Sequence, residues 1–253
     1  MRLQEFAAAM ERIAPMELAA EFDNPGLLIE PDHDEISRVL VALDCTKAVA
    51  EEAAEWGADL VLTHHPLFFH PVKHMAYSDP ATAAACVLLR HGIGLFAAHT
   101  NLDAARGGVN DTLCELLGVR DTIPFDEGIG RVGTLKEPEP LEQFLQRVQA
   151  QLGVKALVSG ELARQVRRIA VLGGSGGSSV LPASAEGADV LVTGELKHSD
   201  AIDAAMLGLA LVVAGHYETE CVVLPPLIKR LQNECFGVQY QLSRVDGSPF
   251  VRL

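Results

Sequence analysis

Short apolar runs alternate with alanine-rich amphipathic stretches along the first half of the chain. The runs RVLVALD (38–44), DLVLTHH (59–65) and IGLFAAHT (93–100) predict strands, and AVAEEAAEWG and PATAAACVLLRHG predict helices between them. Strands that alternate with helices are typical of βαβ units, in which the strands form a mostly parallel sheet. The pattern therefore predicts an α/β fold.

The second half of the chain repeats this rhythm. Strands are predicted at RRIAVLGG (167–174), DVLVTGE (189–195) and LALVVAGH (209–216), with helices near 141–152, 178–186, 199–207 and 220–233. GADLVLTHH and GADVLVTGE are alike, which suggests a duplicated unit. A segment rich in glycine, proline and acidic residues near residue 125 is predicted to join the halves. We therefore expect two related α/β domains with mostly parallel sheets, 1–125 and 126–253, and the last strand, VQYQLSR, is a candidate to join the first sheet.

Composition and charge exclude several classes of protein. The chain of 253 residues is long enough to bury a core without disulfides or a structural metal. It has 20 Lys and Arg against 34 Asp and Glu, a net charge of −14, and no basic run that could follow a phosphate backbone. No apolar segment approaches the ~18 residues that cross a bilayer. Neither nucleic acid nor a membrane is therefore an expected partner.

The cysteines indicate the redox compartment. All five are scattered along the chain, and none is spaced C-x-x-C. This pattern argues against a disulfide framework and against a thiolate zinc site. The N-terminal segment also has no apolar core followed by a cleavage site. We therefore expect a cytoplasmic location.

Histidines follow three of the predicted strands directly, in THHP, AAHTNLD and AGHYETE. In open parallel sheets, ligands gather at the carboxyl ends of the strands. His99 and Asp103 are four residues apart, as are His216 and Glu220, so a helical turn after each strand would place both side chains on one face. Each motif is weak alone, but their conjunction in a chain with nine histidines predicts a metal site.

The pooled candidate ligands offer nitrogen and oxygen but no thiolate: His64, His65, His99, Asp103, His216 and Glu220. Such a set suits zinc, manganese, iron, cobalt or nickel. Six candidates exceed the needs of one catalytic zinc, so we expect two divalent ions about 3.5–4 Å apart with a carboxylate between them. Adjacent residues of a regular strand point to opposite faces. If the strand ends at His64, the two neighbouring histidines can diverge to the two ions.

The other histidines are expected to lie on the surface or behind the ligands: His33, His70, His74, His91 and His198. His198 stays open as a candidate because TGELKHSD also follows a predicted strand.

Eight segments of the chain resemble one known family. They are EFDNPGLL (21–28), VALDCT (41–46), GADLVLTHHPLFF (57–69), AAHTNLD (97–103), GGVNDTLCELLG (107–118), RIAVLGGSG (168–176), GADVLVTGELKH (187–198) and AGHYETE (214–220). They resemble the GTP cyclohydrolase 1 type 2 homologues, also called NIF-three-like dinuclear-metal proteins. The resemblance implies two related α/β domains with a two-metal site in the cleft between them, assembled as a toroidal homohexamer.

Position by position, the resemblance implies which residues bind the ions. The implied metal ligands are His64, His65, Asp103, His216 and Glu220, with His99 close by. The final carboxylate falls on Glu220 rather than on Glu218, and Glu220 is also the residue four positions after His216.

The leading functional hypothesis is a metal-dependent hydrolase that acts on a cyclic amidine or a nucleotide such as GTP. Two cations would lower the pKa of a bound water toward about 7, and His99 would act as the catalytic proton shuttle. The alternative is a non-catalytic metal storage, delivery or regulatory protein, which the acidic composition also suits. This alternative predicts no substrate pocket beside the ions.

A third hypothesis is a serine hydrolase. Gly173, Ser175 and Gly177 form a G-x-S-x-G motif between a predicted strand and helix, and Asp200 and His216 follow in the required order. No HGGG-type oxyanion loop precedes the motif. The competing interpretation is a flexible turn or a phosphate-binding nest of backbone amides.

Overall fold

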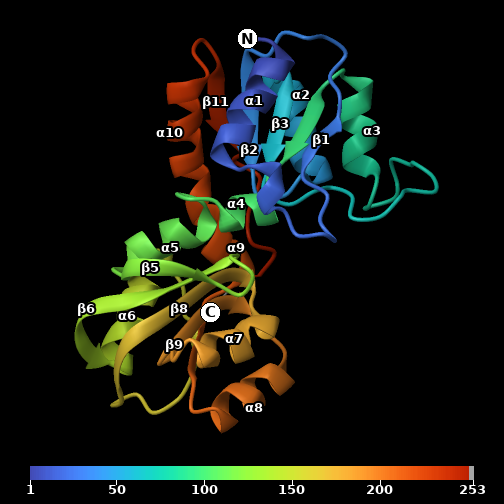
Figure 1. Ribbon diagram of the computed structural model, residues 1–253. Coiled ribbons are helices and arrows are strands. Elements are labelled where there is room, and N and C mark those ends of the chain that lie inside the picture. Colours follow the sequence, from blue (N-terminus) through green and yellow to red (C-terminus); the bar gives the residue numbers. More distant parts are fainter. Residues whose placement is uncertain (251–253) are drawn as a thin grey trace. The chain divides into compact units, whose positions relative to one another are not determined.

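The computed structural model describes residues 1–250, which form two compact units (Figure 1). The first unit comprises Met1–Ala105 and Leu224–Gly247, and the second is built from Arg106–Val223. The chain thus passes between units at Ala105 rather than near residue 125. Helix α5 (Val109–Leu117) belongs to the second unit because it packs on that unit's sheet, on strand β8 (Gln165–Ser175).

The first unit contains a five-stranded, mostly parallel sheet. Its order is β1 (Gly26–Ile29), β4 (Gly94–Ala97), β3 (Leu60–Thr63), β2 (Arg38–Ala42) and β11 (Gln239–Leu242). Only the β1–β4 pairing among these described strands is antiparallel. Strand β11, red in Figure 1, is parallel to β2, blue, so the two ends of the sequence share one sheet.

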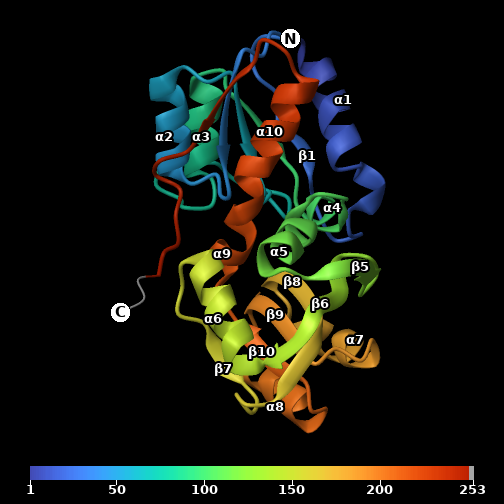
Figure 2. The same ribbon diagram turned by 90° about the vertical axis from the view of Figure 1, so that its left-hand side faces the viewer.

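Helices cover both faces of this sheet. Figure 2 shows α2 (Lys47–Trp56) and α3 (Ala83–Arg90) on one face, and α1 (Leu3–Ile13) and α10 (Leu224–Glu234) on the other. Leu40 and Leu95 are fully buried on the α2/α3 side. Phe96, next along β4, points the other way, and its ring lies edge-on to Phe6 of α1 at a centroid distance of 6.0 Å. Because successive side chains of a strand point to opposite faces, the sheet packs against an apolar layer on each side.

The second unit contains a six-stranded mixed sheet. Its order is β5 (Arg120–Phe125), β6 (Gly130–Pro140), β8, β9 (Val190–Glu195), β10 (Ala210–Val213) and β7 (Leu157–Ser159). Strands β8, β9 and β10 are parallel, whereas β5, β6 and β7 pair antiparallel. The prediction of a mostly parallel sheet is therefore wrong for this unit. The antiparallel strands are very short or contain proline and charged residues, so they lack the continuous apolar pattern of buried parallel strands.

The remaining helices of the second unit lie on two sides of its sheet. An apolar core joins β8 and β9 to α7 (Val180–Ala185) and α8 (His198–Met206). Helices α5 and α9 (His216–Glu220) pack on β8, and α6 (Leu141–Leu152) packs on β6.

Short 3₁₀ helices occur in both units, at Met16–Leu18, Gly177–Ser179 and Cys221–Val223. No helix within residues 1–250 combines the length and apolar character that a membrane crossing requires.

The two units share a repeated strand–helix–strand–helix–strand core, in agreement with the two similar GAD segments. In the first unit Val39, Leu60 and Gly94 are in register across β2, β3 and β4. In the second unit Ile169, Val190 and Ala210 are in register across β8, β9 and β10.

The aspartate of each GAD segment has the same structural role. Asp59 Oδ2 accepts the backbone N–H groups of Ser37 and Arg38 at 2.7 and 2.8 Å. Asp189 Oδ2 accepts those of residues 167 and 168, both at 2.9 Å. Each carboxylate therefore binds the N-terminal part of the neighbouring parallel strand, at the end of the sheet opposite the strands' carboxyl ends.

Candidate metal centres

Strand β3 ends at Thr63, directly before the histidine pair. The backbone amides of His64 and His65 still donate to the carbonyls of Ala42, the last residue of β2, and of Leu43, the residue after it. The two imidazole rings nevertheless lie near each other, with centroids 5.1 Å apart and planes tilted by 47°. The adjacent histidines are therefore not divided between opposite faces of the sheet.

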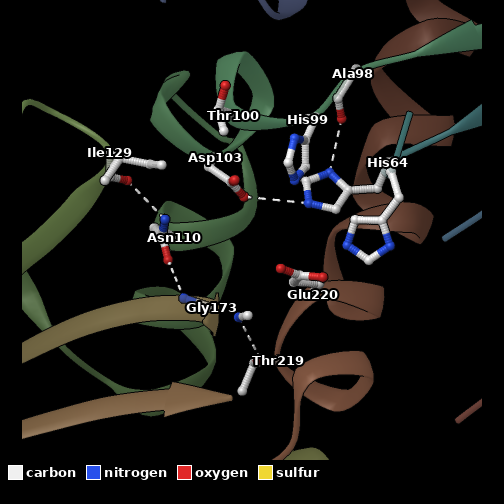
Figure 3. A network of polar contacts seen from close by, with 12 residues as sticks. His64, Ala98, His99, Thr100, Asp103, Asn110, Ile129, Gly173, Thr219 and Glu220 are labelled. Atoms are coloured by element: carbon white, nitrogen blue, oxygen red, sulfur yellow. Dashed lines mark hydrogen bonds and ion pairs between the residues drawn. The ribbon is translucent and has the colours of Figure 1, made fainter. Parts of the chain in front are cut away.

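A third imidazole of the first unit joins this pair. His99 is the residue before the short helix α4 (Thr100–Ala104), and one ligand atom each of His64, His65 and His99 lies within 4.8 Å of the others. Asp103 of α4 places Oδ1 3.6 Å from Nε2 of His64 (Figure 3). This separation is too long for a hydrogen bond. It suits two donors bound to one ion by bonds of roughly 2.1 Å.

The second unit contributes the other predicted pair. His216 and Glu220 are the first and last residues of α9, and Nε2 of His216 lies 3.1 Å from Oε2 of Glu220. The four-residue spacing thus brings the two side chains together, as helical geometry requires. The carboxylate of Glu220 is 5% exposed.

In each of the four histidines at the candidate metal centres, Nδ1 lies close to an oxygen that can only accept a hydrogen bond. The pairs are His64 with the Ala98 carbonyl at 2.8 Å, His65 with Asp44 at 2.8 Å, His99 with Asp23 at 2.8 Å, and His216 with Glu195 at 3.1 Å. Because carbonyl and ionised carboxylate oxygens cannot donate, a hydrogen bond in each pair requires the proton on Nδ1. The neutral imidazole then presents its lone pair at Nε2, which is the form that binds metal ions.

This tautomer makes the pair in α9 suitable for a cation. A lone pair on Nε2 of His216 and an oxygen of Glu220 repel each other at 3.1 Å unless a proton or a metal ion lies between them. The donors in both units therefore fit a divalent metal such as zinc or manganese by their atom types and by their orientation.

Asp23 fixes His99 from a fully buried position. Burial by itself would raise the pKa of Asp23, but hydrogen bonds from His99, from the Thr100 hydroxyl and from the Asn24 amide lower that pKa to about 2. The carboxylate is consequently ionised near neutral pH. It can hold the His99 ring and stabilise a proton on it.

Close packing holds α9 against the ends of β8 and β9. The Gly174 amide donates to Thr219 Oγ1 at 3.0 Å, and the Gly173 amide donates to Asn110 Oδ1 at 2.8 Å (Figure 3). A Cβ at Gly194 would lie 2.6 Å from the Gly174 carbonyl and 2.7 Å from Cα of His216. Glycine at this position therefore lets α9 approach the sheet backbone.

A cavity of about 590 Å³ lies beside Glu195 in the second unit. The polar residues that line it are Ser175, Ser178, Glu195, Lys197 and Asp200. This volume is within the range of small-molecule sites, roughly 300–1,000 Å³. The cavity therefore offers space and polar groups for a small ligand next to a residue that contacts His216.

The geometry does not support the serine hydrolase hypothesis. Ser175 lines the cavity, but the two ring nitrogens of His216 face the carboxylates of Glu195 and Glu220. Asp200 Oδ2 accepts the backbone N–H of Lys197 at 2.8 Å and so caps α8. Neither His216 nor Asp200 is thus placed as a partner for a serine nucleophile.

The other candidate residues lie outside these groups in the described chain. His198 begins α8, His33 contacts Asp32 and Asp59, and His74 lies 3.3 Å from Asp79. Sequence reasoning missed Asp23, Asp44 and Glu195. Asp44 and Glu195 stand at the ends of β2 and β9, so a search of strand ends for carboxylates as well as histidines would have found them.

Known proteins resemble this chain over its whole length. A family model described as Duf34/NIF3 (NGG1p interacting factor 3) matches residues 1–249. The GTP cyclohydrolase 1 type 2 homolog of Clostridium perfringens is 34% identical over 99% of both chains, and that of Methanocaldococcus jannaschii is 37% identical over 87% of this chain and 90% of its own. These matches confirm the family resemblance seen in the sequence.

Solved structures share the fold. A Bacillus cereus protein related to NIF3 has a TM-score of 0.90 and 26% identity, with 100% of this chain and 99% of that chain covered. Reduced HcgD from Methanocaldococcus jannaschii has a TM-score of 0.83 and 33% identity, with 96% and 97% covered. Both the α/β class and the pair of α/β units are thus shared with known proteins.

Proposed function

Because this chain belongs to the Duf34/NIF3 family, we propose that it is a metal-dependent hydrolase of the cyclohydrolase type. Its substrate would be a nucleotide or another molecule with a cyclic amidine, for which GTP is the first probe. The observation that supports this proposal most directly is the common orientation of the four imidazoles. Each has Nδ1 held by an oxygen, which leaves Nε2 as the ligand atom.

In this proposal the chain holds two divalent ions through His64, His65, Asp103, His216 and Glu220. Both units contribute nitrogen and oxygen donors, which suit zinc, manganese, iron, cobalt or nickel. When bound, such a pair of ions supplies a water acidic enough to act as a nucleophile near neutral pH.

The chain's own residues would then handle the proton. His99 is assigned as the catalytic proton shuttle, because Asp23 holds its Nδ1 and directs its Nε2 away from the carboxylate. With GTP, water would add to C8 of the purine and the C8–N9 bond would break. The water oxygen would end in a formamide on N7, with one proton of the water on N7 and the other on N9.

The cavity beside Glu195 favours a hydrolase over a storage protein. Storage or delivery of metal needs no space for an organic ligand, whereas a hydrolase needs a pocket near its ions. The polar residues Ser178 and Lys197 line this space and are suited to contact a polar substrate there.

The test uses metal-free protein, GTP and one divalent ion at a time. We expect ring opening, followed by loss of purine absorbance, only after an ion is added. His64→Ala should abolish the ion-dependent rate, while His74→Ala, at an exposed histidine, should leave it unchanged. Circular dichroism would verify that both variants are folded. An absence of ion-dependent turnover with every nucleotide tested would remove the hydrolase proposal, and reversible binding without turnover would support metal storage or delivery.

We also propose that the chain assembles as a homohexamer that binds neither nucleic acid nor membranes. The family resemblance supports the assembly, and the net charge of −14 disfavours binding to phosphate-rich surfaces. Elemental analysis combined with the mass in solution would test this. We expect about two ions per chain in a particle of six chains, and a monomer with less than one ion per chain would contradict it.

A further inference from the structure

We infer that Asp44 and Glu195 are positioning residues for the metal ligands His65 and His216. The inference rests on the metal binding proposed above. Neither carboxylate belongs to the proposed ligand set, and each contacts the ring nitrogen of its histidine that faces away from the ligand position.

In the first unit, Asp44 follows strand β2 and His65 follows the neighbouring strand β3. The backbone amide of His65 donates to the Leu43 carbonyl at 3.0 Å, which places the two strand ends side by side. Asp44 Oδ1 then accepts from Nδ1 of His65 at 2.8 Å. The sheet pairing and the side-chain contact together fix the orientation of the ring.

In the second unit, Glu195 ends strand β9 and His216 follows the neighbouring strand β10. The Gly215 amide donates to the Gly194 carbonyl at 2.9 Å, so these two strand ends are also adjacent. Glu195 Oε1 lies 3.1 Å from Nδ1 of His216. The ring is thus held at Nδ1 while Nε2 points to Glu220.

The two pairs do not occupy equivalent places in the repeat. Strands β2 and β3 correspond to β8 and β9, whereas the second pair lies on β9 and β10. Duplication of an ancestral unit therefore does not explain why both histidines have a carboxylate on Nδ1. A common requirement of the two histidines, namely a fixed tautomer, does explain it.

A contribution to the stability of the fold is a poor alternative explanation for these two carboxylate–histidine pairs. The side chains of Asp44 and Glu195 are 47% and 57% exposed, and exposed ion pairs contribute little to folding. A carboxylate that accepts the Nδ1 proton of a ligand histidine orients the ring and makes Nε2 more basic. Loss of such a partner typically weakens metal binding about 10–100-fold.

The experiment measures Zn²⁺ and Co²⁺ affinity of the full chain by competition with a chelator, together with the visible absorption of bound Co²⁺. Asp44→Ala and Glu195→Ala should each weaken binding about 10–100-fold and change the Co²⁺ spectrum. Asp44→Asn and Glu195→Gln should recover part of the affinity, because the amide oxygen can still accept from Nδ1. The matched control is Asp79→Ala, which removes the carboxylate 3.3 Å from His74 and should change neither quantity.

The outcomes separate this inference from the proposed function. If the wild-type chain binds no ion, both fail. If the wild type binds ions and the two alanine variants bind them equally well with an unchanged Co²⁺ spectrum, the positioning role fails while the metal site stands. If Glu195→Ala or Glu195→Gln abolishes binding as completely as His216→Ala, Glu195 is itself a ligand and the positioning role is wrong.

Discussion

Gly174 and Glu220 occupy neighbouring space, such that a Cβ built on Gly174 would overlap the Oε1 atom of the Glu220 carboxylate. The backbone of Gly174 also has φ = +66°, a conformation that other residues rarely adopt. The absence of a side chain at the end of β8 therefore makes room for a proposed metal ligand on α9.

Gly174→Ala should consequently impair metal binding as well as folding. We expect the free energy of unfolding to fall by about 1–2 kcal/mol from the left-handed backbone alone, and metal affinity to fall because the Glu220 carboxylate must move. Urea unfolding and ion titration would measure the two effects. Gly187→Ala is the matched control, since Gly187 has φ = +70° but no atom lies within 4 Å of the place that a Cβ would take there. Equal metal affinities of the two variants would contradict this account.

Ser175→Ala should leave hydrolytic activity within about twofold of wild type. The Ser175 side chain lines the cavity, but His216 and Asp200 are engaged with other groups, so no base is placed to activate its hydroxyl. Initial rates at saturating substrate would test this prediction. A loss of roughly a thousandfold or more would instead indicate a serine nucleophile.

Asp59 should make the stability of the first unit depend on acidic pH. Burial alone would raise the pKa of Asp59, but hydrogen bonds from the Ser37 and Arg38 amides and the Ser37 hydroxyl hold that pKa below its usual value. Because the folded-state pKa is lower than the unfolded one, the ionised carboxylate stabilises the fold above about pH 4. That contribution is lost as the pH falls through the folded-state pKa.

Asp59→Asn should therefore lower the free energy of unfolding by about 1–2 kcal/mol at pH 7. The difference from wild type should shrink as the pH falls below about 4 and through the lowered folded-state pKa. Urea unfolding across this range would measure it, with Glu30→Gln, at an exposed position, as the control. A difference that does not change with pH would show that the Asp59 charge is unimportant.

The cysteines should divide into two classes of reactivity. Burial raises the pKa of the Cys45 and Cys114 thiols to about 12, and it also raises the pKa of Cys235. Cys86 and Cys221 are partly exposed. At pH 8 a thiol reagent should label these two first and reach the other three only after unfolding. Labelling of all five at one rate in the folded protein, or no loss of a fast site in Cys86→Ser, would contradict the assignment.

Local patterns were enough to predict the parallel strands and the ligand pairs. Strands β2, β3, β4, β8, β9 and β10 each contain a continuous apolar run, because a strand segment buried on both faces has no side exposed to water. The spacing of His216 and Glu220 brings them together for an equally local reason, since residues four apart share one face of a helical turn. The sequence by itself therefore determined the α/β class and the residues proposed as metal ligands.

The sequence did not show that the motif at His216 is offset by one residue from the motif at His99 in the structural repeat. The amides of Ala98 and Ala214 donate to the carbonyls of Thr63 and Thr193, so these alanines occupy matching places in the repeat. His216 therefore matches Thr100, and its spacing to Glu220 is not inherited from the pair at His99 and Asp103. Strand register, which depends on the neighbouring chain segment, sets this one-residue offset.

Tertiary structure alone decided which oxygen lies beside Nδ1 of each candidate ligand histidine. The partners of Nδ1 come from residues far away in sequence or from adjacent strand ends, such as Asp23 for His99 and Glu195 for His216. It also confirmed that β11, a candidate from the sequence, joins the first sheet beside β2, and it showed that α5 belongs to the second unit. These features depend on contacts between segments separated along the chain, whereas periodicity and spacing report only what neighbouring residues do to one another.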